Sequence, residues 1–338
     1  HAHTTPSRIR IGSRRPLYRD RPGGRRRRRM GIVTPHVCIV VLNWNDRDET
    51  LTCLEALRGL DYASCEVVVV DNGSADDSVA TIRDRHPEVT VLEAGANLGF
   101  TGGNNLGLRW ALERGADYGL LLNNDTDLTP DFLTRTVAAA ESDPRIAIAS
   151  PLILYHTRRD TIWSAGGHID WRRGTAAMMG LNEEDRGQFG STPYDVDFVT
   201  GCALLIKADV MRQLGLLDDR FFVYYEDTEW CVRVRRAGYR AVVAPQARIW
   251  HKITPEAREA SPRVHYLMTR NRLLFLRVTR AGPMAWLYTL LADYGRTLLS
   301  WSLRPRWRSK RLQRRAMIRA ILDAGLVRGG AYTEMAWG

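Results

Sequence analysis

The segment YGLLLNNDTDLTPDFLTRTVAAAE, residues 118–141, decides the fold of this chain. It begins as an apolar run typical of a buried strand and ends in a pattern typical of a helix, with Thr129 as the predicted N-cap and Pro130 as the first helical residue. Between the two the chain turns polar, with four amide and carboxylate side chains: Asn123, Asn124, Asp125 and Asp127. We therefore predict a strand followed by a helix, with a cluster of polar oxygens at the tip of the strand.

Strand and helix patterns alternate on the N-terminal side of this unit. Apolar, β-branched runs at residues 36–44, 66–74 and 89–94 alternate with helical patterns at residues 48–60 and 76–86. Repeated units of this kind predict an α/β fold, in which a mostly parallel sheet is flanked by helices on both faces.

Polar clusters follow four of the predicted strands, as NWND, DNGS, GANLGFTGGNN and NNDTD. The carboxyl ends of parallel strands meet at one edge of the sheet, where ligands bind, so four polar ends predict a site there. Residues 155–197 are less regular and predict a loop-rich insertion beside it, before strand and helix patterns resume at residues 199–239 and end in a strand at residues 240–252. No GxGxxG or GxxxxGK[ST] motif follows a strand, which disfavours a dinucleotide-binding fold and a P-loop NTPase.

Charge is distributed unevenly along the 338 residues. Residues 1–30 contain 11 Arg and one Asp, residues 31–257 contain 22 basic against 33 acidic residues, and residues 258–338 contain 16 against 4. We predict a disordered Arg-rich tail, a globular domain and a basic helical extension with these boundaries. The tail lacks the apolar stretch of a secretory signal, and one interpretation places the natural start at Met30. Nucleic-acid binding is disfavoured, because the tail has no interleaved aromatic residues and no recognisable binding module.

The oxygen atoms at the predicted strand tip suit a hard divalent cation. Asn123, Asp125 and Asp127 alternate along the chain and fit Mg²⁺ or Mn²⁺, with diphosphate oxygens in the remaining positions. The twelve-residue loop of an EF-hand, with its central Gly and terminal Glu, is absent from this stretch. A solvated turn is the plainer alternative. At Asp71 an Asx-turn competes with a hydrogen bond to the base or ribose of a nucleotide.

A second cluster of acids, Glu226, Asp227 and Glu229, follows an aromatic run that we predict to be a strand. Mutual repulsion and apolar walls are expected to raise the pKa of at least one acid, and a carboxylate so placed could remove a proton from an attacking hydroxyl. The alternative is a helix N-terminus, where the helix dipole favours acids. His251, near the end of the last predicted strand, is either a metal ligand or a plain strand-end histidine.

The glycine-rich stretch GFTGGNN, residues 99–105, is predicted to be a loop that enters a helix. Gly102 and Gly103 could let backbone amides approach a phosphate or a sugar, with Asn97 and Asn104 as side-chain partners. Loop flexibility alone is the competing account.

Six motifs occur together in one order: VVLNWN, VVVVDNGSADDS, NLGFTGGNNLGL, LLLNNDT, TGCALLIKADV followed by GLLDDRFFVYYEDTEWCVRVRRAGY, and WH. Each motif is weak alone, but as a set over about residues 36–280 they resemble the family 2 glycosyltransferases, particularly bacterial rhamnosyltransferases. The resemblance implies a GT-A fold with a nucleotide-binding sheet, a nucleotide-sugar donor such as a dTDP- or UDP-sugar, a Mg²⁺ or Mn²⁺ ion, and inversion at the anomeric carbon. It also implies a lipid-linked or polysaccharide acceptor in cell-envelope glycan synthesis.

The resemblance assigns roles to individual positions. It implies that Asp227 is the base that deprotonates the acceptor hydroxyl, with Glu226 as its neighbour, and that Asp125 and His251 are metal ligands. Asn123 stands where the family's DxD motif has its first Asp, which removes one negative charge from the metal site. The predicted donor-binding residues come from the strand ends: Asn43, Asn45, Asp71, Asn97, Gly102, Gly103, Asn104, Asn123 and Asn124.

The C-terminal region carries a long apolar segment and many basic residues. Residues 281–303 are long enough to cross a bilayer, but Asp293 and Arg296 would each cost about 2.5–3.5 kcal/mol at its centre. An amphipathic helix at an anionic membrane surface, or one packed on the core, is the better interpretation, and a solvated helical face is the alternative. The five cysteines are odd in number and form no CxxC pair, which fits a reducing cytosol. We therefore predict a cytoplasmic protein that lies peripherally on the inner face of the membrane.

Two other classes of function compete with sugar transfer. A nucleotidyltransferase could share a similar sheet, but it needs a basic residue near the triphosphate, and the strand tips here are acidic and amidic. A non-catalytic carbohydrate-binding protein would not need metal ligands and a base together.

Overall fold

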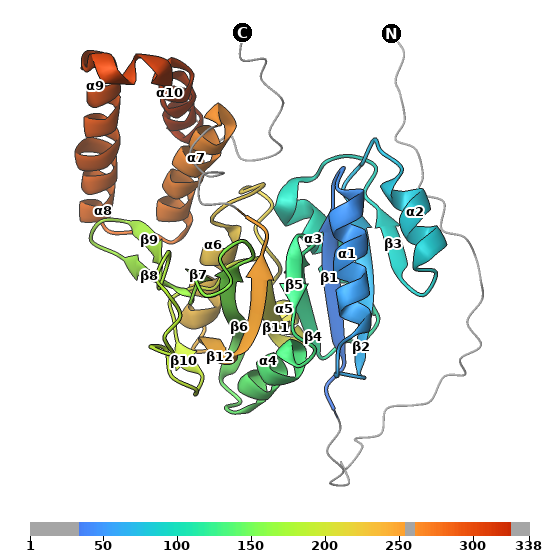
Figure 1. Ribbon diagram of the computed structural model, residues 1–338. Helices are drawn as coiled ribbons and strands as arrows, with labels where there is room; N and C mark the ends of the chain where they lie inside the picture. The colour runs from blue at the N-terminus through green and yellow to red at the C-terminus, as the bar shows by residue number, and fades with distance from the viewer. Residues whose placement is uncertain (1–33, 254–260, 326–338) are drawn as a thin grey trace. The chain divides into compact units, whose positions relative to one another are not determined.

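The computed structural model describes residues 34–253 and 261–325 (Figure 1). The described residues from Pro35 onward belong to one compact unit. The predicted disordered tail and the interpretation of Met30 as a start lie outside the described residues, and the division between a domain and an extension after residue 257 stays a prediction.

The core of the fold is a mixed sheet in the order β10-β12-β6-β11-β4-β1-β2-β3. The strands β1, β2, β3 and β4 are parallel to one another, as are β6 and β12, whereas β11 runs antiparallel between β4 and β6. Two short strands join at the side, β5 on β12 and β7 on β6. The strand bounds are β1 (Val37–Asn43), β2 (Cys65–Asp71), β3 (Thr90–Glu93), β4 (Tyr118–Asn123), β5 (Thr126–Leu128), β6 (Ile146–Tyr155), β7 (Ile162–Ser164), β10 (Tyr194–Asp195), β11 (Ala203–Lys207) and β12 (Arg240–His251).

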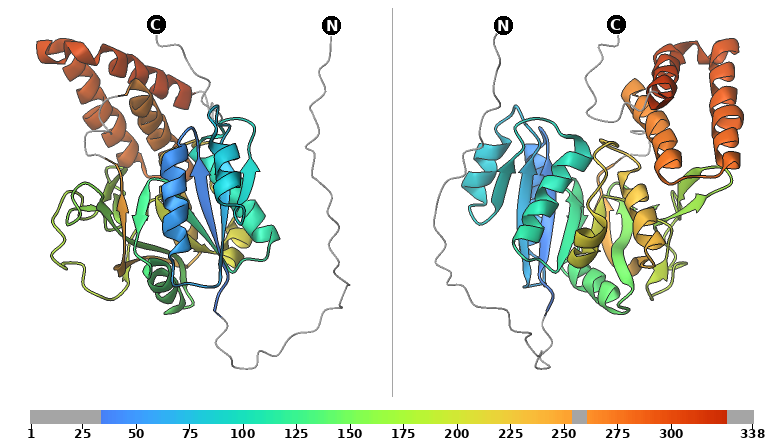
Figure 2. Two further views of the ribbon diagram at one scale, coloured as in Figure 1. Left: turned by 45° about the vertical axis from the view of Figure 1, so that its right-hand side comes forward. Right: turned by 180° about the vertical axis from the view of Figure 1, so that it is seen from behind.

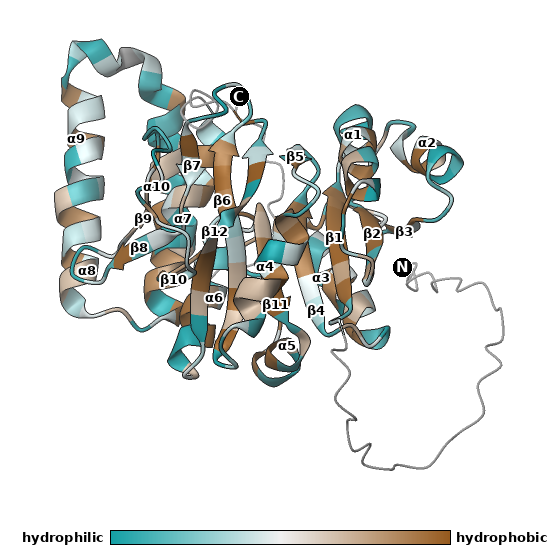
Figure 3. Ribbon diagram, turned by 60° about the horizontal axis from the view of Figure 1, so that its bottom comes forward, coloured by the Kyte–Doolittle hydropathy of each residue, from teal (hydrophilic) through white to brown (hydrophobic). Residues whose placement is uncertain are grey.

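The central strands are hydrophobic on both faces because helices cover both. Along β1, Cys38 and Val40 pack into one core cluster and Ile39 and Val41 into the other, as the alternation of side chains in a strand requires. The first cluster includes α3 (Gly99–Glu113), α5 (Ala208–Leu214) and α6 (Glu226–Arg236), and the second includes α1 (Arg47–Arg58), α2 (Ser78–Arg85) and α4 (Phe132–Glu141). Figure 3 shows these strands as brown, hydrophobic ribbons between more polar helices. The prediction of an α/β fold with a flanked sheet is confirmed.

Three local predictions differ from the structure. The helix α4 begins at Phe132, two residues later than predicted, because the carbonyl of Thr129 accepts the Phe132 N–H in a turn (3.2 Å). The helix α3 begins already at Gly99, so most of the predicted glycine-rich loop is helical. The aromatic run at residues 221–225 is a series of bends rather than a strand. Residues 155–197 contain short strands, among them the hairpin of β8 (Gly167–Asp170) and β9 (Thr175–Met178).

The C-terminal region is helical (Figure 1, orange to red; Figure 2). Its helices are α7 (Pro262–Val278), α8 (Pro283–Leu287), the π-helical η2 (Tyr288–Gly295), α9 (Arg296–Leu303), the 3-10 segment η3 (Pro305–Lys310) and α10 (Arg311–Gly325). The hydroxyl of Ser261 caps α7 by accepting the Arg263 N–H (3.2 Å), and Phe275 and Leu276 of α7 are buried in the core cluster that contains α3 and α6. Within the described ranges, none of the helices has the length and hydropathy that crossing a membrane requires.

Candidate active site

The sheet register brings the polar strand ends to one edge. Asn43 at the end of β1 is paired with Asp71 at the end of β2, and Leu42 is paired with Asn123 at the end of β4. Because β11 runs antiparallel to β4, it begins at this same edge, with Ala203 beside Leu122. Glu93 at the end of β3 is paired with Asp71 as well, so the ends of the four parallel strands lie at this edge, as the sequence predicts, and the start of β11 joins them.

Asp125 and His251 meet at the tip of β4 because β5 turns back and pairs with the end of β12. The Asp125 Oδ1 atom lies 3.1 Å from His251 Nε2, and the Asn123 amide lies 3.4 Å from the same nitrogen. Trp163 packs edge-on against the imidazole, with ring centroids 4.5 Å apart, and fixes its plane. Burial acts to raise the pKa of Asp125, but His251 outweighs it, so the pKa lies below its ordinary value.

This pair fits two ligands of one hard cation. Adjacent ligands of an octahedral ion, each at about 2.1 Å, lie about 3.0 Å apart, close to the observed oxygen–nitrogen distance. Within the described part of the chain, Asp125 Oδ1 is buried and has no hydrogen bond of good geometry. Turning the Asn123 amide by 180° would place its oxygen toward the same point. The described residues contain no group of three or more His, Cys, Asp or Glu side chains that could hold a metal, so other ligands would have to come from the donor or from water.

Asp71 and Asn43 form a buried hydrogen-bonded cluster between the ends of β1 and β2. The Asn43 amide donates to Asp71 Oδ1 (2.9 Å) and accepts from the Thr50 hydroxyl (2.7 Å), and Asp71 Oδ2 accepts the Ser74 N–H (3.0 Å). Asn45 has a φ of 52° and accepts the Ala75 N–H (2.7 Å), closing the same loops. Asp71 is only 3% exposed, and both of its oxygens are used in this cluster. The Asx-type turn that the sequence left open is therefore present, while a nucleotide contact by Asp71 stays a prediction.

Asn124 and Asp127 point away from the Asp125–His251 pair. The Asn124 amide donates to Asp46 and to Thr50 (3.0 Å each), which joins the tip of β4 to the start of α1. Asp127 lies on β5 and is paired with Arg159 (2.8 Å). Its carboxylate is thus engaged in an ion pair, and the structure does not bring it to the predicted metal ligands.

The glycines of the α3 N-terminus serve helix packing. A Cβ atom on Gly103 would overlap Leu42, and one on Gly102 would lie 2.7 Å from Leu98 Cβ. The Gly99 N–H at the start of this turn already has an acceptor, the Asn97 Oδ1 atom (2.8 Å). Asn104 is buried within α3, and its amide donates to the carbonyl of residue 100 (2.9 Å). The expected open phosphate loop is therefore a packed helix, and a donor-binding role for Asn97, Gly102, Gly103 and Asn104 stays a prediction.

Asp227 lies in the first turn of α6, at the mouth of a cavity. Its Oδ2 accepts the Gly201 N–H (2.9 Å) and its Oδ1 accepts the Thr228 hydroxyl (3.1 Å), so the half-buried carboxylate is held in one orientation. The cavity has a volume of about 300 Å³. Its lining combines apolar and acidic side chains: Ala176, Ala177, Met178, Leu181, Phe198, Thr200, Tyr224, Tyr225, Glu226, Asp227, Thr228 and Met268.

Glu226, beside Asp227, is an acid that the fold keeps away from water. Burial, reinforced by the neighbouring Asp227, raises the pKa of Glu226 well above its ordinary value. As far as the structure describes the chain, its Oε2 atom has no hydrogen-bond partner. Burial therefore favours the neutral form of Glu226, and the raised pKa that the sequence predicted for one member of the acid cluster falls on Glu226.

Hydrogen bonds through the backbone connect Asp227 to the Asp125–His251 pair. Gly201, which donates to Asp227, is followed by Cys202, whose carbonyl accepts the Asn123 N–H (2.9 Å). The Asn123 side chain in turn contacts His251. Asp227, Asp125 and His251 thus lie around one rim of the sheet. Gly201 was missed as a functional residue, although the TGC motif that contains it was the signal.

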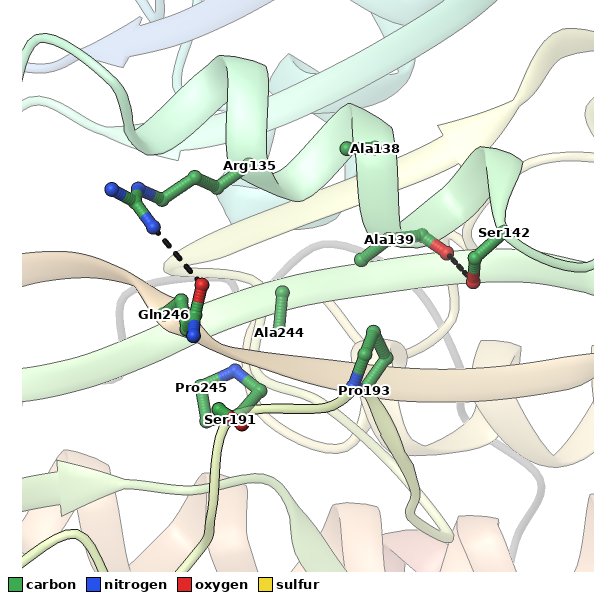
Figure 4. A pocket seen from close by; sticks show the side chains of 9 residues that line it. All are labelled: Arg135, Ala138, Ala139, Ser142, Ser191, Pro193, Ala244, Pro245 and Gln246. Atoms are coloured by element: carbon green, nitrogen blue, oxygen red, sulfur yellow. Dashed lines mark hydrogen bonds between the residues drawn. The ribbon is translucent and has the colours of Figure 1, made fainter.

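A second hollow, of about 230 Å³, lies between α4 and the bulged middle of β12 (Figure 4). Arg135 and Gln246 are hydrogen-bonded across it (3.1 Å), and alanine and proline side chains make up most of the remaining wall. Its lining has no carboxylate or histidine and includes none of the predicted site residues. This hollow therefore offers no acid, base or metal ligand of the kind that the sequence predicts.

A family comparison decides the assignment. Residues 35–270 match the model of the family described as "Glycosyltransferase like family 2". The chain belongs to this family. It is therefore a glycosyltransferase, and the sequence-based identification is confirmed.

Individual relatives agree with the family. The chain is 24% identical over 256 residues to the dTDP-rhamnosyl transferase RfbF of Shigella flexneri, covering 72% of this chain and 81% of the relative. It is 28% identical over 207 residues to the N-acetylglucosaminyl-diphospho-decaprenol L-rhamnosyltransferase of Mycobacterium tuberculosis, covering 55% and 66%. The mannosyltransferase PcManGT of Pyrobaculum calidifontis, solved with GDP-Man and Mn²⁺, superposes with a TM-score of 0.58 at 16% identity and covers 88% of this chain and 89% of its own. The fold is of the GT-A type, as predicted.

Proposed function

We propose that this glycosyltransferase moves a sugar, rhamnose or a related deoxysugar, from a nucleotide-sugar donor to a hydroxyl of a lipid-linked or polysaccharide acceptor, with inversion. The observation that carries the proposal is the meeting of Asp125, His251 and Asp227 at one rim, next to a cavity with apolar and acidic walls. The activities named for the two rhamnosyltransferase relatives support the choice of rhamnose, and the name of the Mycobacterium tuberculosis relative supports a lipid-linked acceptor.

Asp227 is the proposed general base. Inversion requires the acceptor hydroxyl to attack from the side opposite the departing diphosphate, and Asp227 takes up the proton that this hydroxyl loses. The hydrogen bonds from Gly201 and Thr228 aim the carboxylate without neutralising it. Burial favours the neutral form of Glu226 beside it, and a neutral neighbour adds no second negative charge to the cavity.

Asp125 and His251, with the Asn123 amide, are the residues that would hold a Mg²⁺ or Mn²⁺ ion. A bound cation stabilises the negative charge that develops on the departing diphosphate. The Mn²⁺ ion in the solved structure of PcManGT supports this cofactor. Around the site, the chain orients the ligands through Trp163 and the hydrogen-bonded turn at β5.

The donor edge argues against nucleotidyl transfer. A triphosphate needs cationic side chains, and Lys252, which follows β12, is paired with Glu49. A non-catalytic carbohydrate-binding protein does not require an oriented carboxylate such as Asp227 together with two proposed metal ligands, Asp125 and His251. We therefore place both alternatives below sugar transfer.

A ligand screen followed by a transfer assay tests the proposal. UDP-, dTDP- and GDP-sugars are compared by thermal shift with and without Mn²⁺; a donor at 100 times its dissociation constant stabilises by about 2.7 kcal/mol. We expect a dTDP- or UDP-sugar with Mn²⁺ to raise the melting temperature most, and the same donor to be consumed in transfer to a polyprenyl-diphosphate-linked sugar. If no nucleotide sugar stabilises the protein or is turned over, the proposed function is wrong.

We also propose that the C-terminal helices rest on an anionic membrane surface. Met284, Leu287, Leu291, Leu299 and Leu303 are between 52% and 71% exposed, an unusual number of outward apolar side chains in so short a stretch. Exposed arginines follow in η3 and α10, and near an anionic leaflet each contributes about 1 kcal/mol. Binding of this kind would bring a lipid-linked acceptor to the enzyme. Flotation with liposomes tests it: binding should require anionic lipid and weaken when Leu291 and Leu299 are both replaced by Ser, and absence of binding to any liposome contradicts the proposal.

A further inference from the structure

The helix α7 carries three consecutive polar side chains in the protein interior. Arg270, Asn271 and Arg272 are 4%, 0% and 7% exposed. Burying two guanidinium groups and an amide is costly unless each finds hydrogen-bond acceptors. The acceptors they use are backbone carbonyls of two segments far away in the sequence.

The first segment is the bend that precedes Asp227. The Asn271 amide nitrogen lies 2.8, 2.7 and 2.8 Å from the carbonyl oxygens of Phe221, Val223 and Tyr224, and Arg270 donates to the carbonyl of Phe221 as well (2.9 Å). The two N–H bonds of the Asn271 amide thus serve three carbonyls that no regular strand or helix would satisfy, one N–H being shared between two of them.

This bend has a backbone that needs such support. Phe222, Tyr224 and Tyr225 have φ values of 66°, 75° and 72°, in the left-handed region that bulky residues avoid. Strained residues persist only where the surroundings hold them, and they gather at functional sites. The helix α6 begins at Glu226, directly after this strained run, with Asp227 as its second residue, so the bend sets the direction in which α6 starts.

The second segment is the turn of the β8–β9 hairpin. Arg272 donates to the carbonyls of Gly174 (2.8 Å) and Arg173 (3.1 Å) and to the Thr289 hydroxyl (3.1 Å). It also pairs with Asp293 of the π-helical η2 at 2.5 Å. The hairpin is thereby fixed to α7 and η2 together.

Both segments form walls of the cavity at Asp227. One wall comes from Ala176, Ala177 and Met178 of β9, directly after the turn that Arg272 holds, and the other from residues 224–228, at the end of the bend that Asn271 holds. Met268, two residues before Arg270, lines the cavity as well. The side chains of α7 therefore fix the bend at residues 221–225 and the β8–β9 hairpin relative to each other, on opposite sides of the cavity.

We propose that Arg270, Asn271 and Arg272 are positioning residues that fix the two walls of the acceptor cavity and so aim Asp227 at the acceptor hydroxyl. The proposal rests on the proposed function, since it assigns the acceptor to this cavity. The two walls are expected to affect different kinetic parameters. Asn271 acts on the wall that carries the base and controls the rate of transfer, whereas Arg272 acts on the hairpin wall and controls how tightly the acceptor is held.

Steady-state kinetics on the full chain separates these two effects. Asn271→Ala should lower kcat about a hundredfold at an unchanged dissociation constant for the donor, because a base displaced by about 1 Å loses a factor of that size. Arg272→Lys keeps the charge that faces Asp293 but loses the planar fork that reaches both carbonyls. It should raise the acceptor KM about tenfold with a smaller change in kcat. Thr279→Val is the matched control: Thr279 is the C-cap of the same helix, the variant loses one buried hydrogen bond, from the Thr279 hydroxyl to the Phe275 carbonyl (2.6 Å), and Thr279 lines no part of the cavity.

Hydrogen exchange decides the proposal independently of activity. Asn271→Ala should speed exchange at residues 221–228, and Arg272→Lys at residues 173–178, while β1 and β4 keep the exchange rates of the wild type. The proposal is overturned if both variants leave these segments as protected as Thr279→Val does, or if kcat and KM stay at the values of that control. Where Asn271→Ala does not fold, Arg272→Lys alone carries the test. A wild-type chain that turns over no nucleotide sugar would overturn the proposed function, and the exchange result would still decide whether α7 holds the walls.

Discussion

The proposed site has a proposed donor side and a proposed acceptor side, and the two are built in different ways. The donor side consists of strand ends, where Asn43, Asp71 and Asn123 continue regular strands and bond to neighbours across the sheet or a few residues along the chain. The acceptor side consists of a strained bend and a short hairpin, and both are held by side chains of α7. The comparison teaches that this chain places the groups that must stabilise charge on its sheet, and the groups that must fit a particular acceptor on supported loops.

The largest expected effect comes from the acceptor side. Asp227→Asn preserves the shape and the hydrogen bond from Gly201 but removes the proton acceptor. General-base catalysis is worth about 10²–10⁴-fold, so kcat should fall by that factor while the donor still binds. The measurement is transfer rate together with donor affinity by calorimetry.

Two other outcomes for Asp227→Asn would contradict this prediction. If Asp227→Asn turned over at the wild-type rate, Asp227 would not be the base. If it lost donor affinity in proportion to rate, the two sides of the site would not be separable in the way the geometry indicates. Glu229→Gln is a suitable control, because Glu229 is another acid of α6 but is paired with Arg233 (2.8 Å).

The donor side could be predicted from the sequence in most of its detail. Runs such as 67–70 are apolar throughout because both sheet faces are covered, and the polar residue that ends each run marks the sheet edge. The meeting of Asp125 with His251 follows from the order of strands and from the resemblance. The mixed direction of β11 did not follow, since an apolar run reads the same in either direction.

The second prediction tests the donor side. His251→Ala removes one of the two facing atoms at the predicted metal site, and since even supporting residues of metal sites contribute about 10–100-fold, Mn²⁺ affinity should fall by at least that range. Mn²⁺ binding is measured by electron paramagnetic resonance with a nucleoside diphosphate present. His168→Ala, at an exposed position on the β8–β9 hairpin, is the control. Equal Mn²⁺ affinity in wild type and His251→Ala would show that the imidazole holds no metal.

The acceptor side could not be predicted in the same way. The aromatic run 221–225 has the composition of a strand, and nothing in it announces three left-handed residues. Their stability comes from Asn271, some fifty positions further along, and a single sequence does not reveal such a contact. The acids of α6 can be predicted because they are clustered in the sequence. The α7 side chains that hold the bend before them cannot be predicted in this way.

Packing beneath the donor side gives the third prediction. Gly103→Ala introduces a methyl group that overlaps Leu42 of β1, and overpacking of this kind costs about 1–3 kcal/mol. Chemical denaturation measures the loss. Gly59→Ala, whose Cβ would meet only ordinary contact (3.4 Å to the Ala56 carbonyl), is the matched control and should be nearly neutral. An equal loss in the two variants would mean that α3 is not closely packed on β1.

The smallest expected effect is on the free energy of unfolding and comes from the burial of Glu226 on the acceptor side. Because the folded-state pKa of Glu226 is raised, the folded chain retains a proton that the unfolded chain releases once the pH exceeds the ordinary value. Stability is therefore lost by about 1.4 kcal/mol for each pH unit between the ordinary and the raised pKa. Glu226→Gln removes this dependence, so its melting temperature should match the wild type at acidic pH and exceed it increasingly toward neutral pH.

The same variant separates stability from activity. A glutamine resembles the neutral acid in shape and in its capacity to donate a hydrogen bond, so transfer at neutral pH should persist in Glu226→Gln. Melting curves that coincide at every pH would show that Glu226 ionises freely. A gain in stability with retained activity would mean that the cost lies in burying an acid beside Asp227, and the donor side, whose Asp71 is hydrogen-bonded through both oxygens, carries no matching cost at that position.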